Sequence, residues 1–193
     1  MQSMNRARTP VSIDKWENAT KLNLGCGTKR IDDAVNVDLV ASVGPDITHD
    51  LNQRPWPFPD ARFTEVFAYD VIEHCADVIG VMEEIHRVCR DGAIVHITVP
   101  HFSSPNAFTD PTHLHCFGWP SFSYLTGENE LSFYSEYRFR RRFSQIVFAH
   151  TVFNKVVHRL ANHYPEAYER RWAWIFPAWF IYFELEVVKD RGH

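Results

Sequence analysis

The chain has 193 residues, a length that suits one domain with a full hydrophobic core. Hydrophobic residues make up 45% of it and charged residues 23%, as in ordinary globular proteins. Its net charge of −4 at pH 7 excludes a strongly basic protein that holds nucleic acid by its phosphates, so we expect no nucleic-acid partner.

Cysteine usage and the apolar runs favour a cytoplasmic protein. The 4 cysteines form no CxxC pair, which favours free thiols in a reducing compartment. Residues 1–16 contain no apolar core of a signal peptide. The longest apolar run, residues 172–183, contains a proline and is too short for a bilayer core of about 30 Å, so stable membrane insertion is not expected.

The first third of the chain predicts short strands joined by turns. Residues 1–19 are polar and predict an arm or a cap over the active site. The proline-rich residues 52–60 predict an irregular loop. Strands are predicted at residues 21–24, 35–38, 46–48 and 63–69, the last rich in β-branched and aromatic residues.

The next segment predicts a helix followed by a buried strand. Apolar residues at three- and four-residue spacing between residues 78 and 89 predict an amphipathic helix, with Asp77 as its N-cap and Gly92 as its stop. Residues 93–99 form a near-continuous apolar strand. Strand, helix and strand at this spacing indicate a βαβ unit, and therefore an open parallel sheet.

The C-terminal half differs in character, since residues 101–137 are rich in His, Phe, Ser and Pro. The basic run at residues 138–142 predicts a solvated edge. The aromatic residues 172–183 indicate core or a dimer surface, so a homodimer is one expectation. The predicted elements are a strand at 143–152, a helix at 153–160, an aromatic helix at 172–179 and a closing strand at 182–189 with one exposed face.

The glycine turn after the first strand predicts a nucleoside site. Gly25 and Gly27 lie where open α/β sheets bind ligands, and glycine lets the backbone approach a ligand closely. A dinucleotide loop would have a third glycine where this chain has Arg30. Its acid would follow after about 20 residues, whereas Asp38 comes 11 positions after Gly27. The pattern favours a nucleoside without a phosphate tail and disfavours a dehydrogenase.

Acids follow successive predicted strands near this turn. Asp38 can accept hydrogen bonds from both hydroxyls of a ribose. Asp50 and Leu51 are placed to meet a base, and Asp70 faces the same crevice. Such a site suits a ligand with hydroxyls, an exocyclic amine and a cationic tail, and S-adenosylmethionine has all of these.

Five short motifs occur in order within residues 20–100: LNLGCG (22–27), NVDL (36–39), HDL (49–51), PFPDARF (57–63) and YDVIEH (69–74). At this spacing the chain resembles the class I S-adenosylmethionine-dependent methyltransferases, particularly a short bacterial branch with a compressed first crossover. The resemblance continues more loosely through residues 110–122 and 183–189. It departs from the family at Asn23, where many relatives have an acid, and at Thr64 and Glu65, which replace a usual aspartate.

The resemblance implies a fold, a cofactor and its binding residues. The fold is a Rossmann-like, mostly parallel seven-stranded sheet with helices on both faces and a C-terminal antiparallel strand. A single domain, residues 1–193, would divide into a cofactor core (20–100), an acceptor-side segment (101–180) and a closing strand (181–193). S-adenosyl-L-methionine would be bound at its methionine end by Gly25, Cys26 and Gly27, at its ribose by Asp38 beside Leu39, at its adenine by Asp50 and Leu51, and near its amino group by Asp70.

Methyl transfer to a hydroxyl or an ammonium group also requires loss of a proton, for which histidine is suited near neutral pH. We expect His113 to act as base or positioning group on the acceptor side, with His74 and His101 as the next candidates. A rival metal site would use Asp110, His113, His115 and Cys116, with His101 near. That spacing matches no common zinc pattern, so a metal-free pocket is expected.

The sequence therefore predicts a cytoplasmic S-adenosylmethionine-dependent methyltransferase that acts by in-line transfer on a small molecule, a sugar or a lipid intermediate. The alternative is a non-catalytic nucleoside-binding or assembly protein that retains the methyltransferase fold. Aromatic residues around 117–137 could line the acceptor pocket in either case.

Overall fold

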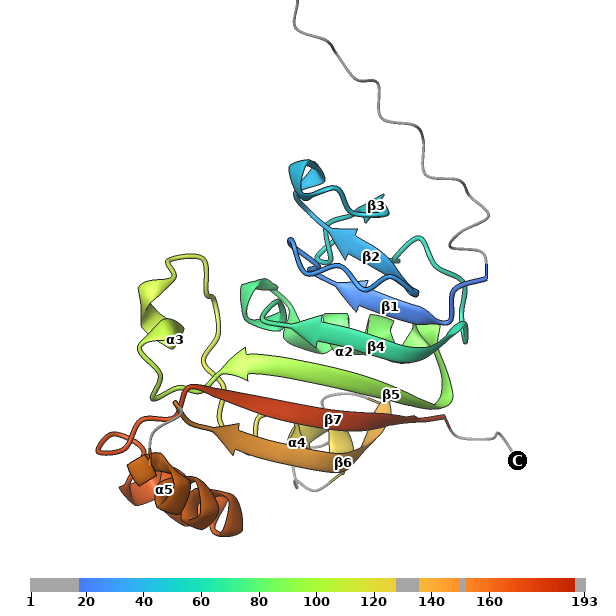
Figure 1. Cartoon of the computed structure of the whole chain (residues 1–193). Coiled ribbons are helices and arrows are strands. Elements are labelled where there is room, and N and C mark those ends of the chain that lie inside the picture. The colour runs from blue at the N-terminus through green and yellow to red at the C-terminus, as the bar shows by residue number, and fades with distance from the viewer. Residues whose placement is uncertain (1–17, 128–135, 150–151, 190–193) are drawn as a thin grey trace, which may run out of the picture.

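The computed structural model describes residues 18–127, 136–149 and 152–189. Within these ranges the strands form one 7-stranded sheet in the order β3-β2-β1-β4-β5-β7-β6 (Figure 1). Strands β1 to β5 pair in parallel, and β7 pairs antiparallel with both β5 and β6. The bounds are β1 (Lys21–Leu24), β2 (Ala34–Asp38), β3 (Ile47–Thr48), β4 (Phe63–Tyr69), β5 (Cys89–Pro100), β6 (Arg138–Val147) and β7 (Phe180–Val188). The predicted mostly parallel sheet with an antiparallel C-terminal strand is confirmed.

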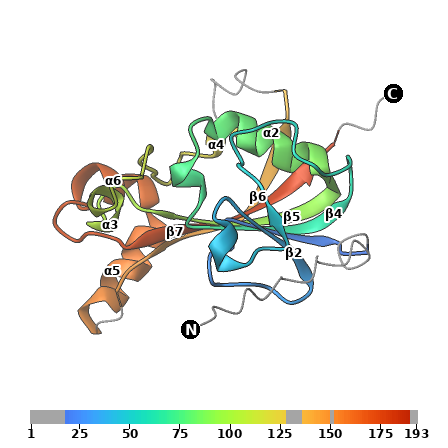
Figure 2. The same cartoon turned by 90° about the horizontal axis from the view of Figure 1, so that it is seen from above.

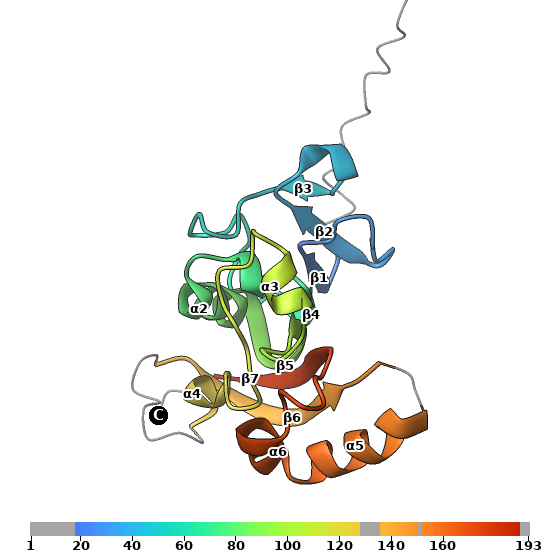
Figure 3. The same cartoon turned by 90° about the vertical axis from the view of Figure 1, so that its left-hand side faces the viewer.

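Helices lie beside the sheet and beyond the carboxyl ends of its parallel strands. The α-helices are α2 (Val78–Val88), α3 (Asn106–Thr109), α4 (Ser123–Thr126), α5 (Val152–His163) and α6 (Pro165–Arg171). Seen from above, α2 and α4 lie over one face and α5 lies below the level of the sheet (Figure 2). Helices α5 and α6 follow edge strand β6 (Figure 3). None of the helices in the described ranges has the length and apolarity to span a bilayer.

The core lies mainly between α2 and the central strands. On β7, and on β5 from Ala93 onward, every second side chain is buried, including Val95 and Ile97 on β5 and Phe183 on β7, all at 0% exposure. Met82 and Ile85 of α2 complete the same apolar cluster. Burying a side chain of this size contributes about 1.5–3 kcal/mol each, so this layer holds the strand ends of the site in place.

Helix α2 starts where predicted but ends earlier than Gly92. Asp77 caps it, since its carboxylate accepts a hydrogen bond from the Gly80 amide at 2.9 Å. The stop at Gly92 is wrong, because the helix ends at Val88 and β5 begins at the next residue. Gly92 lies inside β5 with a φ of 77°, near an irregularity in the pairing with β4. There glycine supplies a backbone conformation that a strand needs at a bulge.

The predicted aromatic helix at residues 172–179 is wrong. Helix α6 lies earlier and begins at Pro165, where a proline is tolerated because the first amides of a helix lack partners. Residues 172–176 form turns, with the Phe176 amide donating to the Trp172 carbonyl. Pro177 has no amide hydrogen with which to continue a helix.

The other predicted elements agree with the structure except at their ends. The strand expected at 143–152 is β6, which begins at Arg138 and therefore contains the basic run. This run is indeed a solvated edge, since Arg140 and Arg142 are exposed and pair with Glu186. Helix α5 and strand β7 correspond to the predictions for 153–160 and 182–189. Residues 1–17 of the predicted arm lie outside the described residues.

A buried ion pair holds the proline-rich loop against α2. The Glu84 carboxylate, 8% exposed, accepts from the Trp56 amide at 2.7 Å and from two nitrogens of Arg87 at 2.7 and 2.8 Å. Arg87 also donates to the Phe58 carbonyl at 2.9 Å. The indole of Trp56 reaches back to the carbonyl of Leu51 at 3.1 Å. The loop that follows the expected base-binding residues is therefore fixed by side chains.

We expect Glu84→Ala to lower the free energy of unfolding by about 2–4 kcal/mol, because it leaves Arg87 and the Trp56 amide partly unpaired in a buried place. Urea denaturation measures this loss. The control Glu166→Ala removes an exposed carboxylate and is expected to change it by less than about 0.5 kcal/mol. Equal effects of the two changes would contradict the importance of the buried pair.

Candidate functional site

The candidate site lies at the carboxyl ends of β1, β2, β4 and β5. These strands point to the same side, and α3 lies beyond their ends (Figure 1). In parallel sheets this edge is where loops gather and ligands bind. Two neighbouring parts can be distinguished there, a glycine loop after β1 and a polar pocket after β4 and β5.

The glycine loop is shaped by close packing against the segment after β4. Gly25 has a φ of 60°, and a Cβ at this position would lie 2.3 Å from Cγ2 of Val71. Only glycine fits there without displacing a neighbour. Gly27 donates its amide hydrogen to Oδ2 of Asp38 at 2.7 Å, which ties the loop to the end of β2. Cys26 between them is buried, and burial raises the pKa of its thiol, so it is a poor nucleophile.

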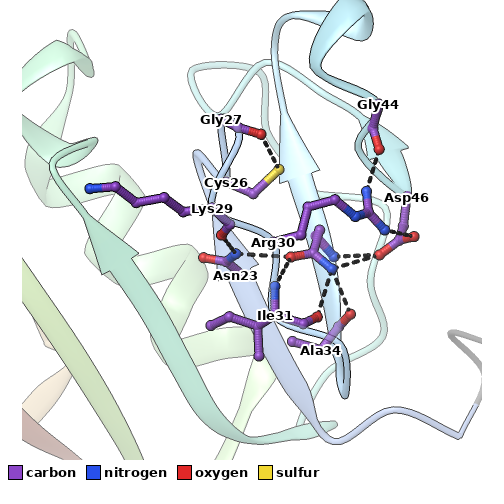
Figure 4. A network of polar contacts seen from close by, with 10 residues as sticks. Asn23, Cys26, Gly27, Lys29, Arg30, Ile31, Ala34, Gly44 and Asp46 are labelled. Carbon is purple, nitrogen blue, oxygen red and sulfur yellow. Dashed lines mark hydrogen bonds and ion pairs between the residues drawn. The ribbon is translucent and has the colours of Figure 1, made fainter.

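The connection from β1 to β2 contains no helix and is held by one buried amide side chain (Figure 4). Asn36 is 0% exposed, and its Oδ1 accepts from the Ile31 amide at 2.8 Å. Its Nδ2 donates to the carbonyls of Ile31 and Ala34 at 2.9 and 3.0 Å and to Asp46 at 2.9 Å. This side chain thereby satisfies backbone groups that a helix would otherwise pair.

Arg30 and Asn23, both departures from the expected patterns, belong to the same network. Asn23 donates to Oδ1 of Asn36 at 2.9 Å and to the Lys29 carbonyl at 3.0 Å. Arg30 donates to Oδ1 of Asp46 at 2.6 Å and to the Gly44 carbonyl. Burial would raise the pKa of Asp46, but the bonds from Asn36 and Arg30 outweigh it and hold that pKa below its usual value. Arg30 thus replaces the third glycine for a structural reason.

Three of the residues expected to hold a cofactor lie at the ends of β2 and β3. Asp38 accepts from the amides of Gly27 and Val40, one on each carboxylate oxygen, so each oxygen keeps a lone pair for a further donor. Leu39 is 64% exposed beside it. Asp50 accepts from the Asn52 amide at 3.0 Å. Leu51, the fourth such residue, is buried and packs in the core cluster.

A pocket of about 560 Å³ opens next to the glycine loop. Asp70 lines it directly after β4, one residue before Val71, the side chain that packs on Gly25. Asp70 has a φ of 53° and accepts from the Thr98 hydroxyl at 2.9 Å. The full lining is Asp70, Glu73, His74, Pro100, Asn106, Thr109, Asp110, His113, Trp179 and Phe180.

Glu73 is the buried carboxylate of this pocket. It is 1% exposed, and neither of its carboxylate oxygens has a hydrogen-bond partner among the described residues. Burial raises its pKa to about 7, and the nearby carboxylates of Asp70 and Asp110 act in the same direction. The only sequence feature that points to Glu73 as a pocket residue is its position directly before His74.

The structure brings together two of the three predicted histidines. The rings of His74 and His113 meet edge to face with centroids 4.7 Å apart. His101 is 0% exposed, contacts the Ser103 hydroxyl at 2.7 Å and Glu169 at 3.3 Å, and does not line the pocket. Its place after β5 predicts a site residue, and the structure places it in a buried set of contacts beside the pocket lining rather than in it.

The structure does not bring together the four residues of the rival metal site, Asp110, His113, His115 and Cys116. His115 contacts the Cys75 carbonyl at 2.9 Å through Nε2, and Cys116 is an exposed free thiol. Among the described residues, the group whose ligand atoms lie within 4.8 Å of one another is Glu73, His74 and His113.

Comparison with known proteins finds one matching family model and several solved structures of the same fold. A family model described as a methyltransferase domain matches residues 41–97. A SAM-dependent methyltransferase from Archaeoglobus fulgidus aligns at a TM-score of 0.59 and 15% identity, covering 90% of this chain and 89% of that one. The 4+2 cyclase SpnF aligns at 0.56 and 15%, covering 91% and 77%. A 16S rRNA adenine methyltransferase with its cosubstrate SAM, from Catenulisporales acidiphilia, aligns at 0.52 and 12%, covering 93% and 91%. Comparison with curated proteins found no match.

We expect Gly25→Ala to destabilise the protein by about 2–4 kcal/mol. The new methyl group would clash with Val71, and alanine disfavours the positive φ at this position. Gly44→Ala is the matched control, since Gly44 also has a positive φ of 75° but no atom within 4 Å of the new methyl group. Its expected cost is about 1 kcal/mol. Urea denaturation of both variants separates the effects, and equal losses would show that packing against Val71 is unimportant.

Proposed function

We propose that this chain is a class I S-adenosylmethionine-dependent methyltransferase that methylates a small molecule, a sugar or a lipid intermediate. The methyltransferase-domain match at residues 41–97 and the likeness of the fold to a solved methyltransferase support this proposal. The cofactor of this chain is S-adenosylmethionine, with which the rRNA methyltransferase of the same fold was solved. The observation that carries the proposal is the packing of Gly25 against Val71, the residue that directly follows Asp70 of the pocket lining.

The glycine loop and the strand ends are proposed to hold the cofactor. Gly25, Cys26 and Gly27 would line its methionine end, and Asp38 beside Leu39 would accept from its ribose hydroxyls. Asp50 and Leu51 would meet the adenine, and Asp70 would face the amino group. Residues 20–100 would thus form the cofactor core of a single domain, with residues 101–180 on the acceptor side.

The size and lining of the pocket support a small acceptor. Its volume of about 560 Å³ suits a small molecule or one sugar unit rather than a duplex. Carboxylates of Asp70, Glu73 and Asp110 would accept from hydroxyl groups and would repel a phosphate backbone. Trp179 and Phe180 offer a wall on which a ring can stack.

The reaction would be an in-line displacement at the methyl carbon. The acceptor's lone pair forms the new bond, the carbon–sulfur bond breaks, and its electron pair stays on sulfur as a neutral thioether. Holding the two reactants in line can lower the barrier by about 7–11 kcal/mol. The acceptor's proton would pass to His113 or His74, the candidate bases that line the pocket.

The function is tested by incubating the protein with labelled S-adenosylmethionine and a panel of hydroxylated small molecules, sugars and lipid intermediates. Methyl incorporation into a member of the panel is the expected result. Tight binding of the cofactor without turnover of any member would favour the alternative, a nucleoside-binding or assembly protein. The likeness to the cyclase SpnF makes this assay necessary, because the fold is shared with a protein named for another reaction.

We expect Asp38→Ala to weaken S-adenosylmethionine binding by at least tenfold, because a hydrogen bond to a charged group contributes about 1.5–3 kcal/mol. Isothermal titration calorimetry measures the dissociation constant. Asp33→Ala is the control on the same connection, since the exposed carboxylate of Asp33 pairs with Lys21 at 2.7 Å, away from Asp38. Unchanged affinity in a folded Asp38→Ala variant would remove the ribose assignment.

A further inference from the structure

The acceptor pocket contains a set of side chains with the chemistry of metal ligands. One ligand atom each from Glu73, His74 and His113 lies within 4.8 Å of the others. The first two residues follow β4 in a short 3-10 turn, and His113 comes from the segment after α3. Two imidazoles and one carboxylate form a donor set typical of divalent first-row transition metals, with positions left open for other ligands.

Glu73 is the buried carboxylate of this set, and it supports a cation as the ligand. Burying a carboxylate without a hydrogen bond is costly, yet both of its oxygens lack a partner among the described residues. Its nearest charged neighbours include Asp70 and Asp110, which share its sign. A positive ion between these groups would compensate their charge.

The distances around His113 suit an intervening ion better than direct hydrogen bonds. Its Nε2 lies 3.9 Å from Oε1 of Glu73 and 3.8 Å from Oδ2 of Asp110. Hydrogen bonds of this kind measure about 2.7–3.2 Å. Two atoms bound to one ion at about 2.0–2.2 Å can lie up to about 4.4 Å apart, so small side-chain shifts suffice to close the site.

His74 is oriented by a partner behind it, as metal-binding histidines usually are. The Thr112 hydroxyl lies 2.6 Å from Oδ1 of Asp110 and 2.9 Å from Nδ1 of His74. Because the hydroxyl has one hydrogen and the carboxylate can only accept, Nδ1 of His74 must be the donor in the second contact. This hydrogen-bond assignment leaves Nε2 of His74 with a free lone pair.

We propose that Glu73, His74 and His113 bind a divalent first-row transition-metal ion in the acceptor pocket, with Asp110 as a further oxygen ligand. Its role in methyl transfer rests on the function proposed above: the ion would hold acceptor oxygens and lower the pKa of a bound hydroxyl. With His74 and His113 as ligands, the proton released from the bound hydroxyl would pass to solvent water in place of the histidine bases named above.

Binding is tested on the full chain freed of metal by a chelator, without cofactor or acceptor. Calorimetry and visible absorption with Co²⁺ are expected to give one ion per chain and absorption bands of a nitrogen- and oxygen-bound ion. Mg²⁺, which prefers oxygen ligands, is expected to bind at least tenfold more weakly. Absence of saturable Co²⁺ binding, or equal affinity for Mg²⁺, would overturn the proposal.

Co²⁺ binding to substituted proteins tests whether these side chains hold the ion. Glu73→Gln and His113→Asn are each expected to weaken Co²⁺ binding at least tenfold, and Thr112→Val, behind His74, by about tenfold. His49→Asn and Glu166→Gln, outside the pocket, are the controls and should bind as the unchanged protein does. Unaltered binding in a folded Glu73→Gln variant would place the ion elsewhere. Circular dichroism checks folding, and Co²⁺ should raise the melting temperature of the unchanged protein but not of Glu73→Gln.

The outcome separates this proposal from the proposed function. Methyl transfer at an undiminished rate by the metal-free protein would remove the ion from the reaction while leaving the methyltransferase assignment intact. Specific Co²⁺ binding that needs Glu73 and His113 supports the site even if no acceptor in the panel is methylated. Loss of turnover on metal removal, restored by Co²⁺, supports both.

Discussion

The buried amide of Asn36 is the interaction on which the glycine turn of this protein depends. The connection between β1 and β2 lacks a helix, and Asn36 adds partners for the backbone of Ile31 and Ala34 to the few backbone hydrogen bonds that the connection makes itself. Asn36 pairs with the turn at Ile31, with β1 through Asn23 and with Asp46 before β3. One neutral side chain thereby fixes three segments, and the glycine turn and Asp38 keep their relative positions because of it.

The pocket after β4 and β5 follows the opposite principle. There a polar group is buried without being satisfied, since neither carboxylate oxygen of Glu73 has a partner in the part of the chain that the structure describes, and two other carboxylates lie close to it. Such an arrangement costs stability and persists where the surrounding fold holds it.

Much of the fold could be predicted from local patterns, whereas the site could be predicted only in part. Apolar runs located the strands, and the cap at Asp77 follows from its chemistry. The prediction of a helix at residues 172–179 is wrong, because the spacing of aromatic residues alone does not indicate where a chain turns. Asn36 and Glu73 were not singled out, since an amide or an acid gains its role from neighbours distant in sequence. The contact of His101 with Glu169 of α6, 68 positions away, is likewise beyond local sequence patterns.

Strand β7 lies between β5 and β6 although it is the last of the strands to be synthesised. Until residue 188 leaves the ribosome, β5 and β6 each expose an unpaired edge, which is the feature of nascent β-proteins most prone to wrong pairing. Phe180, the first residue of β7, and Trp179 just before it also line the pocket after β4 and β5. The strand that joins β5 to β6 therefore also supplies two of the pocket's aromatic side chains.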